Sequence, residues 1–260
     1  MNRDCPEEFL GIANLLADAS GAAIRPYFRS GVIIEDKPDE SPVTVADKYA
    51  EQEIRQRLQK YCPDHGVVGE EFGAQDAGRS HVWVIDPIDG TRSFICGVPT
   101  FTTLIALLRE GEPILGVIDQ PVSGERWLGA RGHGTTLNSK RVTTRAAVAL
   151  DQAAMYTTTP DMYEEIDAPA YNRLRSAVHA TRFGLDGYAG GLLASGLIDL
   201  HVEGAMQPWD YMALVPVIEN AGGIMTDWQG RGLTLDTGRG LTIGASCPEL
   251  HEAALFVLSC

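Results

Sequence analysis

Disulfide patterns and membrane-length apolar runs are missing from this sequence. Its 260 residues include five cysteines, an odd number without a Cys-x-x-Cys pair. Because disulfide-bonded secreted domains carry even sets of cysteines, we expect reduced thiols and a cytoplasmic protein. No apolar run approaches the ~20 residues of a membrane-spanning helix, so we expect a soluble protein. The first residues, MNRDCPEEFL, lack the charged and then apolar order of a signal peptide, and we expect none.

Positive charge is scarce. Lys and Arg total 21 against 35 Asp and Glu, which gives a formal net charge of -14. Nucleic acids and anionic membranes attract basic surfaces, so we expect neither among the partners of this protein. The same negative charge would repel an anionic substrate, unless bound cations reverse the local field, as metal ions do in many sites.

Apolar residues are plentiful, at 44% of the chain, and are sufficient for one large domain. Their spacing predicts helices at residues 7–29, 47–60, 161–180 and 207–223, and a small-residue helix followed by a strand within 187–204. Strands or hairpins are predicted at 65–73, 81–86, 101–121 and 124–142, and a mobile loop or hairpin at 31–46. Because helices alternate with antiparallel-looking strands, we predict a layered α+β fold.

The sequence WVIDPIDGTRSF, residues 83–94, leads an apolar strand directly into two carboxylates. Asp86 and Asp89 are three residues apart, so they cannot both lie on one face of a continuous strand. Pro87 interrupts the strand, and both carboxylates can then turn toward one point at its C-terminal end. Such close like charges are costly without a cation between them, and Mg²⁺ prefers hard oxygen ligands. We therefore predict a Mg²⁺ site; the alternative is a solvated turn with a capping aspartate.

Gly90 and Thr91 follow these carboxylates. Glycine permits close backbone approach, and the two backbone amides can face a phosphate at the start of a helix. Phosphatases that form an aspartyl-phosphate place a second aspartate two residues after the nucleophile. The spacing of three residues here favours water activated by a metal ion over a covalent intermediate.

Two other short stretches are acidic. The sequence GEE places Glu70 and Glu71 at the end of a predicted strand, and PWD places Asp210 in the first turn of a predicted helix. Taken singly, these are more ordinarily a solvated glutamate pair and an aspartate that faces a helix dipole. Together with residues 86–91 they form a recognisable set.

This set resembles the inositol monophosphatase superfamily of Mg²⁺-dependent phosphatases, through GEE, WVIDPIDGTRSFICGVPTF and PWDYMALVPVIENAGG. The resemblance covers nearly the whole chain. It implies a layered αβαβα sandwich of the inositol monophosphatase and fructose-1,6-bisphosphatase type, a homodimer, hydrolysis of small phosphate monoesters and frequent inhibition by lithium. It also implies a single phosphatase unit over residues 1–260, with a metal- and phosphate-binding half at 1–145 and a substrate-binding half at 146–260.

The resemblance assigns roles residue by residue. The implied ligands of two or three Mg²⁺ ions are Glu70, Asp86, Asp89, Asp210 and the carbonyl of Ile88. The implied catalytic residues are Glu70, Thr91 and Asp47; Thr91, in contact with Asp47, would orient the nucleophilic water. The backbone amides of Gly90 and Thr91 would hold phosphate oxygens, and the segment around Lys37 resembles a loop that closes on the site.

Within the superfamily, residues 182–228 resemble the histidinol-phosphatase branch. Asp186 and Glu203 match positions that face the alcohol part of the substrate, and Asp210 lies beside it. Histidinol carries an ammonium and an imidazole, so two carboxylates suit it. The implied reaction is hydrolysis of L-histidinol phosphate, a step of histidine biosynthesis. The alternatives are an inositol-1-monophosphatase, a broad-range sugar or nucleotide phosphatase, and a non-catalytic metal-dependent sensor.

Several residues leave the branch assignment open. Asp186 lies between glycines and could be only a turn residue, while Glu203 is expected throughout the superfamily. Gly187 stands where the branch often has Cys, and Gly190 where it often has an aromatic residue, which allows a reshaped pocket. Arg182 either pairs with Asp186 or reaches the active site of a neighbouring subunit.

Overall fold

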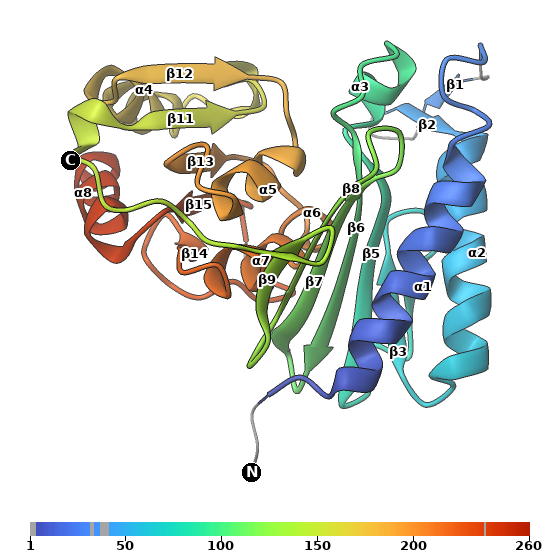
Figure 1. Ribbon diagram of the computed structural model, residues 1–260. Coiled ribbons are helices and arrows are strands. Elements are labelled where there is room, and N and C mark those ends of the chain that lie inside the picture. The colour runs from blue at the N-terminus through green and yellow to red at the C-terminus, as the bar shows by residue number, and fades with distance from the viewer. Residues whose placement is uncertain (1–3, 32–33, 37–41, 237) are drawn as a thin grey trace.

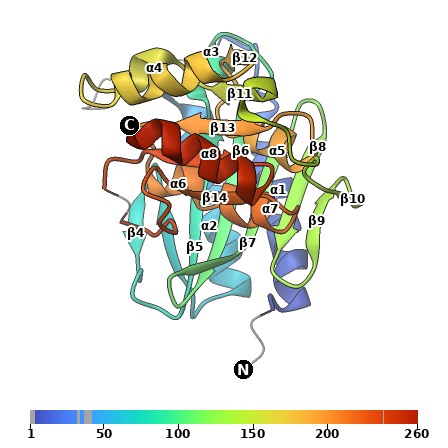
Figure 2. The ribbon, with the colours of Figure 1, turned by 90° about the vertical axis from the view of Figure 1, so that its left-hand side faces the viewer.

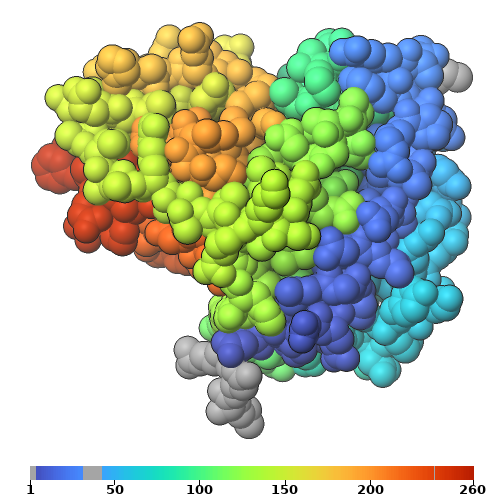
Figure 3. Space-filling view, in the orientation of Figure 1, coloured from blue at the N-terminus to red at the C-terminus, as the bar shows by residue number. Residues whose placement is uncertain are grey.

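The computed structural model describes residues 4–31, 34–36, 42–236 and 238–260. Two sheets alternate with three layers of helices in an αβαβα arrangement (Figure 1). The predicted layered α+β fold is therefore confirmed. Figure 3 shows the N-terminal residues, blue to green, packed beside the C-terminal residues, yellow to red, with a hollow between them at the top.

The first outer layer consists of the helices α1 (Glu7–Ile24) and α2 (Val45–Tyr61), which pack side by side (Figure 1). They cover an eight-stranded sheet of order β10-β9-β8-β7-β6-β5-β3-β4. Its strands are β3 (Gly66–Gly69), β4 (Gly73–Gln75), β5 (His81–Asp89), β6 (Thr102–Arg109), β7 (Glu112–Gln120), β8 (Glu125–Ala130), β9 (Gly134–Leu137) and β10 (Lys140–Val142). Only β3 and β5 pair in parallel within this sheet; its other neighbouring strands are antiparallel.

The second sheet has five strands in the order β12-β11-β13-β15-β14. They are β11 (Ala154–Thr157), β12 (Ala180–Phe183), β13 (Leu200–Glu203), β14 (Ile224–Asp227) and β15 (Thr242–Ala245). The strands β12, β11 and β13 are parallel to one another, so their carboxyl ends meet at one edge. The predicted boundary at residue 145 falls in the segment between the two sheets.

The remaining helices form the middle and second outer layers. Between the sheets lie α5 (Tyr188–Ala194), α6 (Pro208–Tyr211) and α7 (Leu214–Glu219); outside the second sheet lie α4 (Ala168–Ala177) and α8 (Pro248–Ser259), as Figure 2 shows. The smaller elements are the antiparallel pair β1 (Ile34–Asp36) and β2 (Pro42–Thr44), the helix α3 (Thr91–Ile95), and single turns of 3-10 helix at Leu150–Gln152 and Pro160–Met162.

The apolar run of β5 lies between two cores. Val82 and Val84 face the middle helices, whereas Trp83 and Ile85 face α1 and α2, and all four side chains are buried. Side chains of a strand alternate between the two faces of its sheet. A strand covered on both faces therefore reads as a continuous apolar run, which is why residues 82–85 show no polar alternation.

Three predicted helices differ from the structure. The helix predicted at 7–29 ends at Ile24, because Pro26 lacks an N–H and disfavours helix at the residue before it. The helix predicted at 207–223 is divided into α6 and α7, since Pro216 cannot donate to the carbonyl of Met212. The helix predicted at 161–180 is only α4, from Ala168 to Ala177, and β12 begins directly after it.

Among the described residues, no helix combines the length and apolarity that crossing a bilayer requires. All five cysteines carry free thiols.

Candidate active site

A bulge in β5 brings its two aspartates together. Asp86 pairs with Leu104 of β6 and Asp89 pairs with Thr102, so three steps along β5 oppose two along β6. Such an extra residue bends a strand and changes the direction of its side chains.

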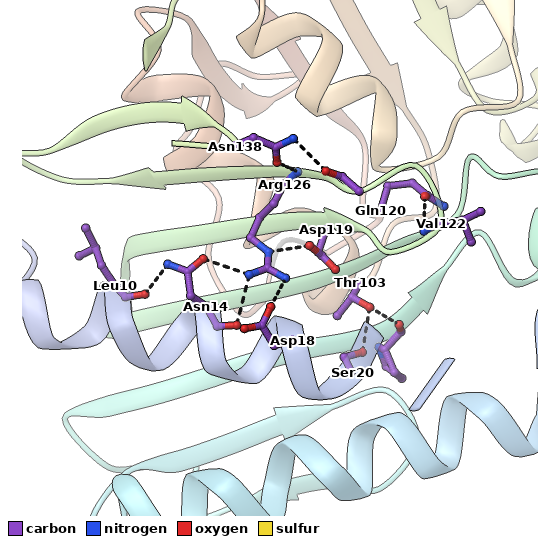
Figure 4. A network of polar contacts seen from close by, with 12 residues as sticks. Leu10, Asn14, Asp18, Ser20, Thr103, Asp119, Gln120, Val122, Arg126 and Asn138 are labelled. Atoms are coloured by element: carbon purple, nitrogen blue, oxygen red, sulfur yellow. Dashed lines mark hydrogen bonds and ion pairs between the residues drawn. The ribbon is translucent and has the colours of Figure 1, made fainter. Parts of the chain in front are cut away.

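Hydrogen bonds from two neighbouring layers fix this bulge. The hydroxyl of Thr103 donates to the carbonyl of Pro87 at 2.8 Å and lies 2.9 Å from the hydroxyl of Ser20 in α1 (Figure 4). In the same region, Arg126 of β8 contacts Asp119 and reaches Asp18 of α1. The helical layer is thus tied to the sheet close to the bulge.

Three carboxylates meet at the bulge. Oxygen atoms of Asp86, Asp89 and Asp210 all lie within 4.8 Å of one another. Asp210 also caps α6, because its Oδ2 accepts a hydrogen bond from the N–H of Gln207 at 2.7 Å. The capping and ligand interpretations of this aspartate are therefore compatible, and the structure brings the three predicted carboxylate ligands together.

The electrostatics of the cluster favour a bound cation. Burial, followed by the charges of Glu70, Asp89 and Asp210, raises the pKa of Asp86 well above its usual value. Burial, followed by Asp186 and Asp210, does the same to the pKa of Asp89. The pKa of Asp210 is raised to about 7, mainly by burial. Within the described part of the chain, no Lys or Arg forms an ion pair with these three aspartates. Their carboxylate oxygens are the ligands that a hard divalent cation prefers, and such a cation would balance their negative charge.

Glu70 reaches this cluster from the end of β3, where its N–H donates to the carbonyl of Ile85 at 3.2 Å. The turn that carries it is held by Glu51 of α2. The buried Glu51 carboxylate accepts hydrogen bonds from the N–H of Glu71 at 2.8 Å and from Arg55 at 2.7 Å. Glu51 could not be predicted from the sequence, because its position within a helix gives no sign of a contact with a distant strand end.

Asp47 and Thr91 differ in part from the expectation. One Asp47 oxygen, Oδ2, accepts from the N–H and hydroxyl of Thr44 at 2.9 and 2.6 Å, and the buried Oδ1 has no hydrogen-bond partner among the described residues. Burial is the main cause that raises the pKa of Asp47 to about 6. The Thr91 hydroxyl donates to the carbonyl of Ile88 at 3.1 Å, so the predicted contact with Asp47 is not a hydrogen bond in the described structure.

The Gly90 turn is shaped for a residue without a side chain. Gly90 has φ 81°, in the left-handed region, and precedes the first residue of α3. A Cβ atom at Gly90 would lie 2.7 Å from Oδ2 of Asp186, which enters from the loop after β12. The predicted phosphate-binding turn and a predicted substrate residue are therefore in direct contact, although they belong to different sheets.

A cavity of about 120 Å³ adjoins the cluster. It lies where β11, β12 and β13 end, and is lined by Asp89, Thr158, Met162, Asp186, Gly187, Glu203, Gly204, Ala205, Met206 and Asp210. Four of these side chains are carboxylates, and none of the described lining residues is Lys or Arg. A larger cavity of about 810 Å³, between α4, α8 and residues 227–241, contains none of the predicted site residues.

The two predicted substrate carboxylates both line this cavity. Asp186 has φ 47°, so it is a turn residue, yet its Oδ2 also accepts a hydrogen bond from the Ser93 hydroxyl at 3.2 Å. Burial and then the charge of Glu203 raise the pKa of Asp186. The Glu203 carboxylate accepts from Thr158 and His201. Ser93, Thr158 and His201 were not predicted from the sequence, although the alternation in LHVE puts His201 and Glu203 on one strand face.

A side chain at either of the two unusual glycines would meet neighbouring atoms at close range. A Cβ atom at Gly187 would lie 2.7 Å from Oδ2 of Asp89, and the Gly187 N–H already donates to that oxygen at 2.6 Å. A Cβ at Gly190 would meet Leu214 at 3.0 Å, inside the core. Arg182 is exposed, and no ion pair with Asp186 forms among the described residues. Lys37 lies outside the described residues.

Divalent metal should stabilise this protein more strongly as the pH rises. The folded-state pKa of Asp210 is about 7, above the ordinary value of 3.8 for an aspartate. Between these values the metal-free folded protein binds more protons than the unfolded chain, so its stability falls as pH increases. A cation binds the ionised cluster and offsets this loss. Melting curves with Mg²⁺ and with EDTA should therefore diverge from pH 5 to pH 8, by about 5–10 °C at a hundredfold excess over Kd.

Asp210→Asn is the matched variant for this measurement, because it keeps the shape of the side chain and removes one charge. Its metal-dependent difference in melting temperature should be smaller and less dependent on pH. The same difference at pH 5 and pH 8 in the parent protein would contradict the cation-binding interpretation.

Comparison with known proteins agrees with this geometry. A model of the inositol monophosphatase family matches residues 6–257. The chain is 45% identical to the "bifunctional phosphatase IMPL2, chloroplastic" of Arabidopsis thaliana, over 96% of this chain and 74% of the relative. It is 40% identical to a histidinol-phosphatase of Chlorobaculum parvum, over 89% of this chain and 90% of the relative. The structure of an inositol monophosphatase from Zymomonas mobilis superposes with a TM-score of 0.89 at 42% identity, over 98% of each chain.

Proposed function

The chain belongs to the inositol monophosphatase family of metal-dependent phosphatases, and from this premise we propose that it uses Mg²⁺ to hydrolyse L-histidinol phosphate to L-histidinol and phosphate. The observation that carries the substrate proposal is the acidic lining of the small cavity beside the metal cluster. Asp186 and Glu203 lie there with no cationic residue in the described lining. Histidinol carries an ammonium and an imidazole, which form charge-assisted hydrogen bonds with carboxylates. Two relatives with histidinol-phosphatase or bifunctional phosphatase names support the same choice.

In the proposed mechanism, residues of the first sheet act on the phosphate and residues of the second sheet bind the alcohol. Bound Mg²⁺ supplies positive charge to the phosphate and lowers the pKa of a water nucleophile. In this proposal Glu70 accepts a proton from the water, as does Oδ1 of Asp47, which has no hydrogen-bond partner among the described residues, and the Thr91 hydroxyl positions the water. The backbone amides of Gly90 and Thr91 hold phosphate oxygens.

On the other side of the site, the second sheet holds the alcohol. Asp186 and Glu203 would bind the ammonium and imidazole of the leaving histidinol, and Asp210 bridges this pocket and the metal cluster. The proposed place of the reaction is therefore histidine biosynthesis, in the cytoplasm.

A second candidate is inositol 1-phosphate or a wider range of sugar and nucleotide phosphates. It is favoured by the 42% identity and close superposition with an inositol monophosphatase structure. Side-by-side kcat/KM values for L-histidinol phosphate, inositol 1-phosphate and glycerol phosphate distinguish the candidates. A metal-binding sensor without catalysis, the remaining alternative, would turn over none of them with Mg²⁺.

We also propose a homodimer in which Arg182 lies near the active site of the neighbouring subunit. The support is that β12 is an edge strand whose Arg182 and Phe183 side chains are exposed, three or four residues before Asp186. Sedimentation of the full-length protein tests the oligomeric state.

Asp186→Asn should reduce the preference for a cationic ester. The variant keeps the shape of the side chain but turns a charge-assisted hydrogen bond into a neutral one, a difference of about 1 kcal/mol or more. We expect KM for L-histidinol phosphate to rise by about tenfold, which corresponds to about 1.4 kcal/mol. The neutral ester glycerol phosphate is the control, and its kcat/KM should change much less. An equal loss on both esters would make Asp186 a turn residue without a role in selectivity.

A further inference from the structure

Beneath the acidic cavity, a buried histidine contacts the carboxylate that the proposed function assigns to substrate binding. We propose that His201 is a positioning residue, which orients the Glu203 carboxylate toward the cavity and thereby sets the affinity for the ammonium-bearing alcohol. This inference rests on the proposed function for the identity of the alcohol. The contact between His201 and Glu203 does not depend on it, because both residues lie in β13 of the second sheet.

The strand β13 places both side chains on one face. His201 and Glu203 are two residues apart, and their relative exposures are 0% and 3%. Nε2 of His201 lies 3.0 Å from Oε1 of Glu203. An ionised carboxylate can only accept hydrogen bonds, so Nε2 carries the proton and donates it.

The two oxygens of Glu203 are used unequally. Oε1 accepts from the N–H of Thr158 at 2.9 Å, from the Thr158 hydroxyl at 3.1 Å and from His201 at 3.0 Å. Among the described residues, the one donor to Oε2 is the Thr158 N–H, which it shares with Oε1, at 3.1 Å. Because Oε1 is saturated by protein donors, the lone pairs of Oε2 remain for a donor in the cavity that Glu203 lines. An ammonium group is such a donor.

A histidine at position 201 has a cost in stability. Its Nδ1 is buried and has no hydrogen-bond partner in the described structure, and an unsatisfied buried polar atom destabilises a fold. In return, His201 donates a hydrogen bond to Glu203, which an aliphatic residue could not do. Without it, Glu203 would be fixed by Thr158 alone, at one end of its carboxylate.

Two substitutions of His201 separate the donor from the packing. In His201→Gln the side-chain amide nitrogen can occupy the place of Nε2, whereas in His201→Asn it reaches only the place of Nδ1. We expect His201→Asn to raise KM for L-histidinol phosphate by about tenfold, the effect of losing one charge-assisted hydrogen bond to the oriented carboxylate, with kcat changed by less than about threefold. His201→Gln should restore KM to within about threefold of the parent value.

A double-mutant cycle with Glu203→Gln shows whether the effect passes through Glu203. In the Glu203→Gln background, His201→Asn should have almost no further effect on KM. The positioning role is overturned if KM rises and kcat falls to the same extent in His201→Asn and in His201→Gln. It is also overturned if His201→Asn raises KM just as much in the Glu203→Gln background. Melting curves of all variants identify any loss caused by unfolding. If His201→Asn does not fold, the Thr158 hydroxyl, which is the other side-chain donor to Oε1, is tested instead. KM should then rise in Thr158→Val and stay near the parent value in Thr158→Ser.

Failure of the proposed function has a different signature. If the parent enzyme prefers a neutral ester, the substrate proposal is wrong. The double-mutant cycle is then measured with that ester, and the positioning role again predicts a change in KM without a change in kcat. Calorimetric binding of L-histidinol gives a reading without turnover: the Kd should rise about tenfold in His201→Asn and be restored in His201→Gln. Equal Kd values in the parent and both variants would overturn the positioning role.

Discussion

Asp86→Asn should lower kcat by about a thousandfold or more, because it removes charge from the centre of the metal cluster while keeping the size of the side chain. Asp86 is buried, and its carboxylate lies within reach of both Asp89 and Asp210. A metal ion contributes several kcal/mol to the stabilisation of phosphoryl transfer, and each 1.36 kcal/mol is about a factor of ten in rate. Initial rates at saturating substrate over a wide range of Mg²⁺ concentration measure this loss.

Asp151→Asn is the matched control, because Asp151 is an exposed aspartate in the turn of 3-10 helix before β11. It should retain the parental rate. An Asp86→Asn variant as active as the parent, or full parental activity in EDTA, would exclude the metal-dependent mechanism.

Thr91→Ala should lower kcat by about a hundredfold or more while the Mg²⁺ concentration for half-maximal rate stays nearly constant. The Thr91 hydroxyl bonds to the Ile88 carbonyl and is not part of the carboxylate cluster. Its proposed role is to position the water, so its removal should affect the chemical step and leave the binding of the cation intact.

Thr91→Ser keeps the hydroxyl and should recover most of the rate. Parallel losses of rate and Mg²⁺ affinity in Thr91→Ala would instead place Thr91 among the groups that hold the metal.

The sequence was most informative where a local pattern determined the structure. The apolar run before Asp86 and the spacing to Asp89 predicted two converging carboxylates, and the bulge in β5 brings them together. The predicted break of the strand at Pro87 is wrong, because β5 continues through Pro87 to Asp89 and only its register shifts. Helix lengths were less predictable. Apolar periodicity continues past Ile24 and through Pro216, and there the backbone constraints of proline decide where each helix ends.

The second half of the site depends on strand order, which no local pattern contains. Thr158 contacts Glu203 only because β11 and β13 pair in parallel and end at the same edge. Ser93 of α3 meets Asp186 because the loop after β12 lies against the turn at the end of β5. Threonine and serine are common in loops, so neither residue carries a sequence signal that distinguishes a site contact from a solvated hydroxyl.

The hydrogen bond from the Gly187 N–H to Asp89 has a consequence for synthesis of the protein. It joins a residue of the first sheet to a loop of the second, and Asp210 completes the metal cluster from still further along the chain. On the ribosome the first sheet, which ends at Val142, emerges well before either partner. A nascent chain at that stage carries the β5 aspartates without their C-terminal partners. Catalytic competence is therefore a late, all-or-none property, acquired only when a complete second sheet has docked on the first.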